Sequence, residues 1–148
     1  MTELGLQLKE VVSNAKRELE RFSESEAALV RGEDGWSRKQ IVGHLIDSAS
    51  NNHLRFVRAL LQPEIRMPGY DQDGCVRVER FQELPWTELL EFWATYNLFL
   101  AHVIAGFPED KLNTPCWIGE YPTMTLRELA EDYLRHMKHH LDQIKAQT

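Results

Sequence analysis

The sequence predicts an all-α protein, a four-helix bundle formed by one domain over residues 1–148. Four long segments repeat their apolar residues with helical periodicity, and two of them begin with a capping pattern. No segment shows the apolar-polar alternation of a half-buried strand. The 148 residues are 43% hydrophobic and 27% charged, which is typical of one folded domain with its own core.

The first helix is expected from about Thr2 to Phe22, because apolar side chains recur there at helical spacing. These are Leu4, Leu8, Val11, Val12, Ala15 and Leu19. Residues Ser23 to Gly35 are small, polar and charged, which predicts a short turn or helical fragment followed by a loop.

The second helix has a clear beginning, since Ser37 followed by Gln40 forms a capping-box pattern. Trp36 precedes the cap in the position of a hydrophobic staple, and Pro63 ends the helix at about Gln62. One stripe of this helix should face the core: Ile41, Leu45, Ser48, Asn52, Phe56 and Ala59.

The third helix should run from about Trp86 to Gly106, with Trp86 and Trp93 in the core. The fourth should begin at Thr125, where Glu128 completes a second capping box, and continue to about Ala146. Its inner stripe is Leu126, Ala130, Tyr133, Met137, Leu141 and Ile144.

Two connections without expected regular structure join these helices, Pro63 to Pro85 and Pro108 to Met124. The first is long for a small domain, and such loops often carry function. Because it is long enough to cross the bundle, we expect the helices to run up-down-down-up.

Charge and composition exclude several classes of function. A net charge of -6 argues against nucleic-acid binding, which needs a basic surface. No apolar run is long enough to span a membrane, and the first ten residues lack the features of a secretion signal. Cys75 and Cys116 show no metal-binding spacing and no sign of an oxidising compartment, so we expect a cytoplasmic protein.

Histidines provide the strongest chemical signal. His136 and His140 lie four residues apart, so both imidazoles share one face of the last helix, whereas His139 points to its polar face. Two histidines at this spacing are also common in helices that bind no metal, where they are solvated or hydrogen-bonded. His44 flanks the inner stripe of the second helix and is the candidate third ligand, although it could equally bond a backbone carbonyl in the core.

Three neutral imidazoles would suit a divalent transition metal (zinc, nickel, iron or copper) better than magnesium or calcium. A site with three protein ligands leaves a position for water or substrate, as catalytic sites do. The side chains within reach to orient the histidines are Asp47, Asp132 and Asn97, each of which could instead be solvated or a polar core residue.

Other polar residues carry weaker signals. Arg55 lies three turns after His44 on nearly the same face and could bind an anionic substrate group, or form a buried ion pair. Tyr70, Asp71 and Asp73 could line the mouth of the site or serve only as turn residues. Cys116 has no basic neighbour in sequence that would lower its pKa, so we expect it to be inert.

Two blocks of sequence resemble the DinB/YfiT-like superfamily. Residues 35–47, GWSRKQIVGHLID, resemble the start of that family's second helix, where a Trp-Ser cap precedes a His-Leu pair. Residues 125–129, TLREL, followed by 136–144, HMKHHLDQI, resemble its last helix with His-x-x-x-His. The likeness extends from Trp36 to Ile144, and the two blocks together are far more specific than either alone.

This resemblance implies a four-helix bundle with a three-histidine metal site at one end, here His44, His136 and His140, and frequent homodimers. Members of the family include S-transferases that use bacillithiol or mycothiol, a maleylpyruvate isomerase and metal-dependent hydrolases. A bundle is only a scaffold, so the family does not decide the reaction.

We therefore expect a metal-dependent enzyme, either a hydrolase or a transferase that uses a low-molecular-weight thiol, acting on a small-molecule substrate. The alternatives are a non-catalytic metal- or small-molecule-binding bundle of a stress response, and a structural helical dimer with incidental histidines. The sequence contains no glycine-rich phosphate loop or Gly-x-Ser-x-Gly elbow that would support other catalytic machinery.

Overall fold

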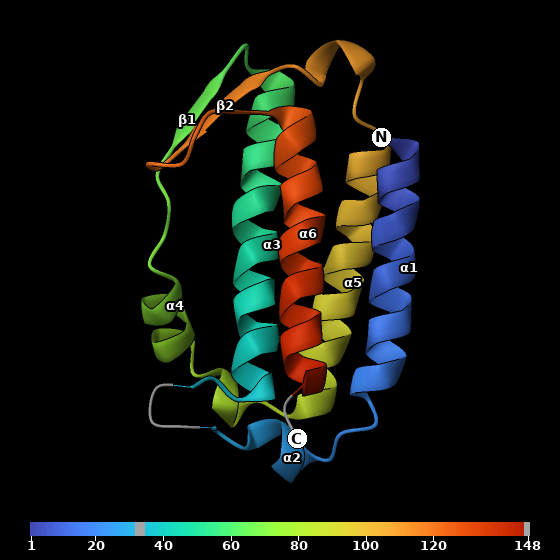
Figure 1. Ribbon diagram of the computed structural model, residues 1–148, viewed down its shortest axis with the longest axis vertical. Helices are drawn as coiled ribbons and strands as arrows, with labels where there is room; N and C mark the ends of the chain where they lie inside the picture. The colour runs from blue at the N-terminus through green and yellow to red at the C-terminus, as the bar shows by residue number, and fades with distance from the viewer. Residues whose placement is uncertain (32–34, 147–148) are drawn as a thin grey trace.

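Four long helices lie side by side in the computed structural model, which describes residues 1–31 and 35–146 (Figure 1). They are α1 (Thr2–Leu19), α3 (Arg38–Leu61), α5 (Trp86–Ala105) and α6 (Leu126–Ala146). Helices α1 and α6 run in one direction and α3 and α5 in the other. The predicted bundle and its up-down-down-up order are therefore confirmed.

The start of α3 follows directly from its sequence. The Ser37 hydroxyl accepts a hydrogen bond from the Gln40 backbone N–H, while the Gln40 side chain accepts one from the Ser37 N–H. The helix ends at Leu61, before Pro63. All six predicted inward positions of this helix are buried, so its apolar stripe faces the core as the helical period requires.

The same agreement holds for the other long helices. Thr125 and Glu128 form the predicted capping box at the start of α6, and the inner stripe of α6 is buried. Trp86 and Trp93 are core residues of α5. Helix α1 ends at Leu19 rather than Phe22, because the chain turns there into α2 (Glu24–Ala28), which has its own capping box between Ser23 and Glu26.

Helix α2 is the helical fragment expected within Ser23 to Gly35, and residues 32–34 of the loop predicted after it lie outside the described residues.

The expectation of no strands was wrong in the two connections. Three short strands, β1 (Ile65–Met67), β2 (Pro115–Ile118) and β3 (Met124–Thr125), form one sheet in the order β1-β2-β3. Strand β1 pairs with β2 in parallel, and β2 pairs with β3 antiparallel. Strands of two to four residues are too short to show alternation, and β1 and β2 meet only because the bundle brings distant connections together.

The sheet lies at one end of the bundle, where α3 ends and α6 begins (Figure 1). Beyond β1, the long connection also forms α4 (Gln72–Glu79) and the 3₁₀ helix η1 (Phe81–Glu83), both of which contact α3. The 3₁₀ helix η2 (Glu109–Lys111) follows α5. The two connections, which the sequence analysis expected to lack regular structure, therefore form short strands and helices that cover one side and one end of the α3–α6 pair.

No helix among residues 1–31 and 35–146 combines the length and apolar character needed to cross a membrane. The homodimer implied by the family resemblance stays a prediction, since a single chain does not test it.

The packing of η1 on α3 gives a prediction about Gly43. A Cβ at Gly43 would overlap the ring of Phe81, which packs against this position of α3. In an open helix interior, Gly→Ala stabilises by about 0.5–1 kcal/mol. We expect Gly43→Ala to have the opposite sign and to destabilise the protein by about 1–3 kcal/mol, measured by urea denaturation.

The control is a double-mutant cycle with Phe81→Ala, which removes the ring atoms from the space that the new methyl group needs. The two substitutions should together cost less than the sum of their separate effects. Stabilisation by Gly43→Ala alone would show that Phe81 does not limit this position.

Candidate metal centre

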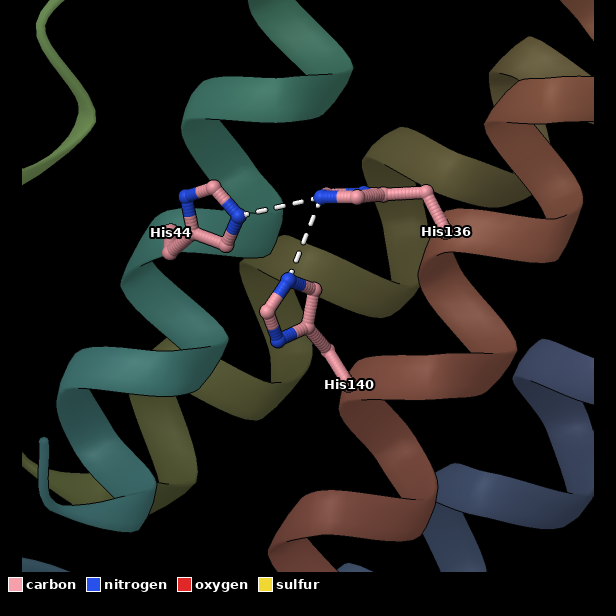
Figure 2. Close-up of side chains that lie close together, drawn as sticks. All are labelled: His44, His136 and His140. Carbon is pink, nitrogen blue, oxygen red and sulfur yellow. Dashed lines mark hydrogen bonds between the residues drawn. The ribbon is translucent and has the colours of Figure 1, made fainter.

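Three imidazoles meet between α3 and α6 (Figure 2). His44 comes from the second turn of α3, and His136 and His140 come from consecutive turns of α6. The Nε2 atom of His136 lies 3.2 Å from that of His44 and 3.1 Å from that of His140. One ring nitrogen from each residue falls within 4.8 Å of the others. The structure thus brings together all three predicted site residues.

The spacing of these nitrogens fits one shared ion. Imidazole nitrogens bind zinc at about 2.0–2.1 Å, so two nitrogens on a tetrahedral ion lie about 3.3 Å apart. The distances from His136 to its two neighbours are close to this value. Neutral nitrogen donors also suit zinc, nickel or ferrous iron. The three histidines are therefore a suitable ligand set, and metal binding itself stays a prediction.

Burial keeps the three imidazoles neutral, which is the form that binds metal. Burial and the neighbouring histidines lower the pKa of His44 from 6.5 to about 3. Burial is also the main cause that lowers the pKa of His136 to about 4, and it lowers that of His140. At neutral pH each of the three rings therefore has one unprotonated nitrogen.

Gln143 orients one of the three rings, a role that the sequence analysis missed. Its side-chain oxygen lies 2.9 Å from Nδ1 of His140. Because an amide oxygen only accepts, Nδ1 carries the proton and Nε2 is left free to bind an ion. The signal was available in the sequence, since Gln143 follows His140 by three residues and so lies on the same side of α6.

His44 lacks such a partner among the described residues. Its Nδ1 is buried without a hydrogen bond, and its ring packs against the indole of Trp36 at a centroid distance of 5.0 Å. Trp36 therefore lies against the candidate ligand as well as next to the helix cap. The alternative that His44 bonds a core carbonyl is not supported, because its Nε2 faces His136 instead.

The three side chains proposed to orient the histidines bond elsewhere. Asn97 accepts from the Tyr133 hydroxyl and donates to the Trp93 carbonyl. Asp132 forms an ion pair with Arg135. Asp47 hydrogen-bonds Glu79 of α4.

Asp47 is buried next to Glu79, and these two causes raise its pKa to about 8. One carboxyl group of the pair therefore keeps its proton near neutral pH. The helical period placed Asp47 on the inner side of α3, but it could not show that α4 covers that position.

A cavity of about 510 Å³ adjoins the candidate centre. His136 lines it, together with Asp132 and Tyr133 of α6 and residues from α3 and both connections. This volume lies within the usual range for small-molecule sites. The only acidic side chain of this lining is Asp132 among the described residues, and its carboxylate acts to raise the pKa of His136.

The remaining predicted residues divide between this cavity and other roles. Arg55 and Tyr70 line the cavity, and no described carboxylate pairs with Arg55, which excludes the buried ion pair within this part of the chain. Asp71 caps α4 by accepting from the Gly74 N–H, and neither it nor Asp73 reaches the cavity, so both are turn and helix residues.

Cys116 behaves as expected of an inert thiol. It is buried, its Sγ donates to the Thr114 carbonyl, and burial raises its pKa to about 11. The thiolate, which is the reactive form, is therefore disfavoured.

Comparison with known proteins places these features in context. The family model of the DinB superfamily matches residues 7–144. A Bacillus pumilus protein named "Putative metal-dependent hydrolase" is 27% identical over 116 residues, which are 74% of this chain and 63% of that protein. This chain thus matches less than two thirds of that relative's length.

Among solved structures, YfiT from Bacillus subtilis matches with a TM-score of 0.84 and 20% identity, covering 97% of this chain and 82% of that one. YfiT is described as "a probable metal-dependent hydrolase with an unusual four-helix bundle topology". At this identity the likeness shows that the two chains share a fold.

The low histidine pKa values give a prediction about acid stability of the metal-free protein. Between pH 6.5 and 4.5 the unfolded chain takes up protons on these histidines, whereas the folded chain does not. Proton uptake then favours unfolding, so His44 should lower the free energy of unfolding by up to about 1.4 kcal/mol per pH unit as the pH falls.

The measurement is the difference in this slope between the wild type and His44→Gln, from denaturation curves across that range. The comparison is needed because the raised pKa of Asp47 contributes with the opposite sign in both proteins. Equal slopes in the two proteins would contradict the depressed pKa of His44.

Proposed function

This chain belongs to the DinB superfamily, and on that premise we propose that it is a metal-dependent hydrolase of a small molecule. The observation that carries the proposal is the meeting of three neutral imidazoles beside a cavity of substrate size. His44, His136 and His140 would hold the ion. The Bacillus pumilus relative and YfiT are both described as metal-dependent hydrolases, which supports the reaction class.

The three histidines would not fill the coordination sphere of a metal ion. Three protein ligands leave at least one coordination position, which is the arrangement of catalytic zinc sites. When bound, the ion would supply Lewis acidity that polarises a substrate carbonyl and eases the deprotonation of water. Gln143 would contribute indirectly by holding His140 in the tautomer whose Nε2 faces the ion.

Asp132 is the proposed proton acceptor. It lies one turn before His136 on α6 and lines the same cavity. Its carboxylate, which also pairs with Arg135, would take a proton from attacking water and return it to the leaving group. The sequence offered no means to choose this carboxylate over the other acidic residues of α6.

A second candidate is transfer to a low-molecular-weight thiol. The cavity has a volume sufficient for a small thiol and an electrophile, and the buried Arg55 in its wall could bind a carboxylate of the thiol. In this reaction the thiolate would attack the electrophile, and Asp132 would not be needed to activate water.

A panel of assays separates these candidates. Metal-loaded protein would be tested on small esters, amides and phosphoesters without thiol, and on electrophiles with several thiols. Turnover without thiol that is lost in His140→Ala supports hydrolysis. Turnover only with thiol supports transfer, and metal binding without turnover in either panel supports the non-catalytic bundle.

Metal content tests the centre itself. Protein purified without an affinity tag should bind one equivalent of divalent metal, and His44→Ala should lower affinity at least 100-fold because it leaves only two imidazoles. Gln143→Leu should weaken binding about 10-fold, whereas Gln143→Glu should retain it because the acceptor remains. Metal content by mass spectrometry and titration would measure both.

His139→Ala is the matched control, because this neighbouring histidine is exposed and outside the cluster. Equal metal binding by the wild type and His44→Ala would contradict the proposed centre.

The proton transfer role gives a separate prediction. Asp132→Asn should reduce kcat for hydrolysis by about 10²- to 10⁴-fold while metal content stays unchanged, since only the proton acceptor is removed. Glu131→Gln, an exposed neighbour on α6, changes the net charge equally and should have little effect. Full hydrolytic activity in Asp132→Asn would assign the proton transfer to another group.

A further inference from the structure

Among the described residues three cationic side chains are buried in the core, and two of them have clear partners. Arg38 donates to the backbone carbonyls of Ile144 and Glu26, and Lys39 pairs with Glu24. Arg55 is also only 8% exposed. Unlike the other two, it has no ion pair or side-chain hydrogen bond with any residue that the structure describes.

Arg55 lines the cavity beside the candidate metal centre. The groups that act on its charge are the hydroxyls of Tyr70 and Tyr121, which line the same cavity. An arginine that is largely removed from water without a counter-ion is costly to the fold. Such a residue is expected where a ligand, rather than the protein, supplies the negative charge.

We propose that Arg55 binds the carboxylate of the substrate. This proposal rests on the proposed function, since it assigns one end of the molecule whose other end reacts beside His136. The planar guanidinium forms two parallel hydrogen bonds with a carboxylate, and the Tyr70 hydroxyl can donate a further one.

The cavity lining and the helix geometry indicate how far the carboxylate of the substrate lies from its reacting bond. Its wall includes the apolar side chains of Ile118, Met124 and Leu129 as well as the polar side chains of Ser48 and Asn52. Arg55 follows His44 by eleven residues of one helix, about 16 Å along its axis, and side chains of a helix tilt towards its N-terminus, which here is the direction of His44. The carboxylate and the reacting bond of the proposed substrate are therefore separated by on the order of 10 Å.

The charge of the cavity favours a monocarboxylate over a phosphate monoester. Among its described lining residues, the one other cationic side chain besides Arg55 is Arg135, which is exposed and paired with Asp132. A single unpaired cation balances one negative charge, whereas a phosphate dianion would remain partly uncompensated.

The test is binding of straight-chain monocarboxylates of four to twelve carbons to the metal-free protein, measured by calorimetry. The matched amides and alkyl phosphates are the comparison ligands. We expect a carboxylate of intermediate length to bind about 10- to 100-fold more tightly than its amide. Arg55→Gln should remove that preference, and Arg55→Lys should restore part of it.

Arg58→Gln is the matched control, because Arg58 lies one turn further along α3 and is exposed. A second readout is thermal stability without ligand. Removal of an unpaired buried cation should leave Tm unchanged or raise it, whereas a cation with a structural role would lower Tm on removal.

The proposal is overturned if no carboxylate binds in an Arg55-dependent manner, if alkyl phosphates bind more tightly, or if Arg55→Gln unfolds the protein. Because these measurements need no metal and no turnover, they are separate from the test of hydrolysis. Carboxylate binding without hydrolysis would reject the proposed reaction and retain the role of Arg55.

Discussion

The antiparallel contact between α3 and α6 decides whether this protein has a site at all. His44 lies in the second turn of α3, whereas His136 and His140 lie in the middle and the second half of α6, so the rings meet only in one alignment of the two antiparallel helices. A shift of one helical turn, about 5.4 Å, would separate His44 from its partners. One contact between the two helices in this alignment is the hydrogen bond that Arg38, in the first turn of α3, donates to the Ile144 carbonyl near the end of α6.

This arrangement is costly to the fold. The Nδ1 atom of His44 and one carboxyl oxygen of Asp47 are buried without a hydrogen bond, and Arg55 is buried without a counter-ion, in the part of the chain that the structure describes. Unsatisfied polar groups weaken a core, and natural proteins concentrate them where function requires it. The contact of α1 with α5 consists mainly of apolar side chains, so that half of the bundle can offset the cost.

Membership of the DinB superfamily and the fold shared with YfiT place the chain on a known scaffold. A scaffold does not decide a reaction, because function depends on the groups around the reacting atoms. In this chain those groups come from the two connections as much as from the helices. Both contribute to the cavity wall, so substituting their residues could change the substrate without altering the bundle.

The sequence by itself determined the four helices, their caps and their buried stripes, because helical periodicity and capping act over a few neighbouring residues. It also placed His136 and His140 on one face of α6 and offered His44 as a candidate third ligand, and it was the family resemblance that implied all three as one metal site. Tertiary structure decided what depends on contacts between distant segments. The β1–β2 pairing, the burial of Asp47 under α4, the convergence of Asp132 and Arg55 on one cavity, and the absence of a described counter-ion for Arg55 are all of this kind. None of these could be derived from the spacing of residues along the chain, since each depends on which distant segments the fold brings into contact.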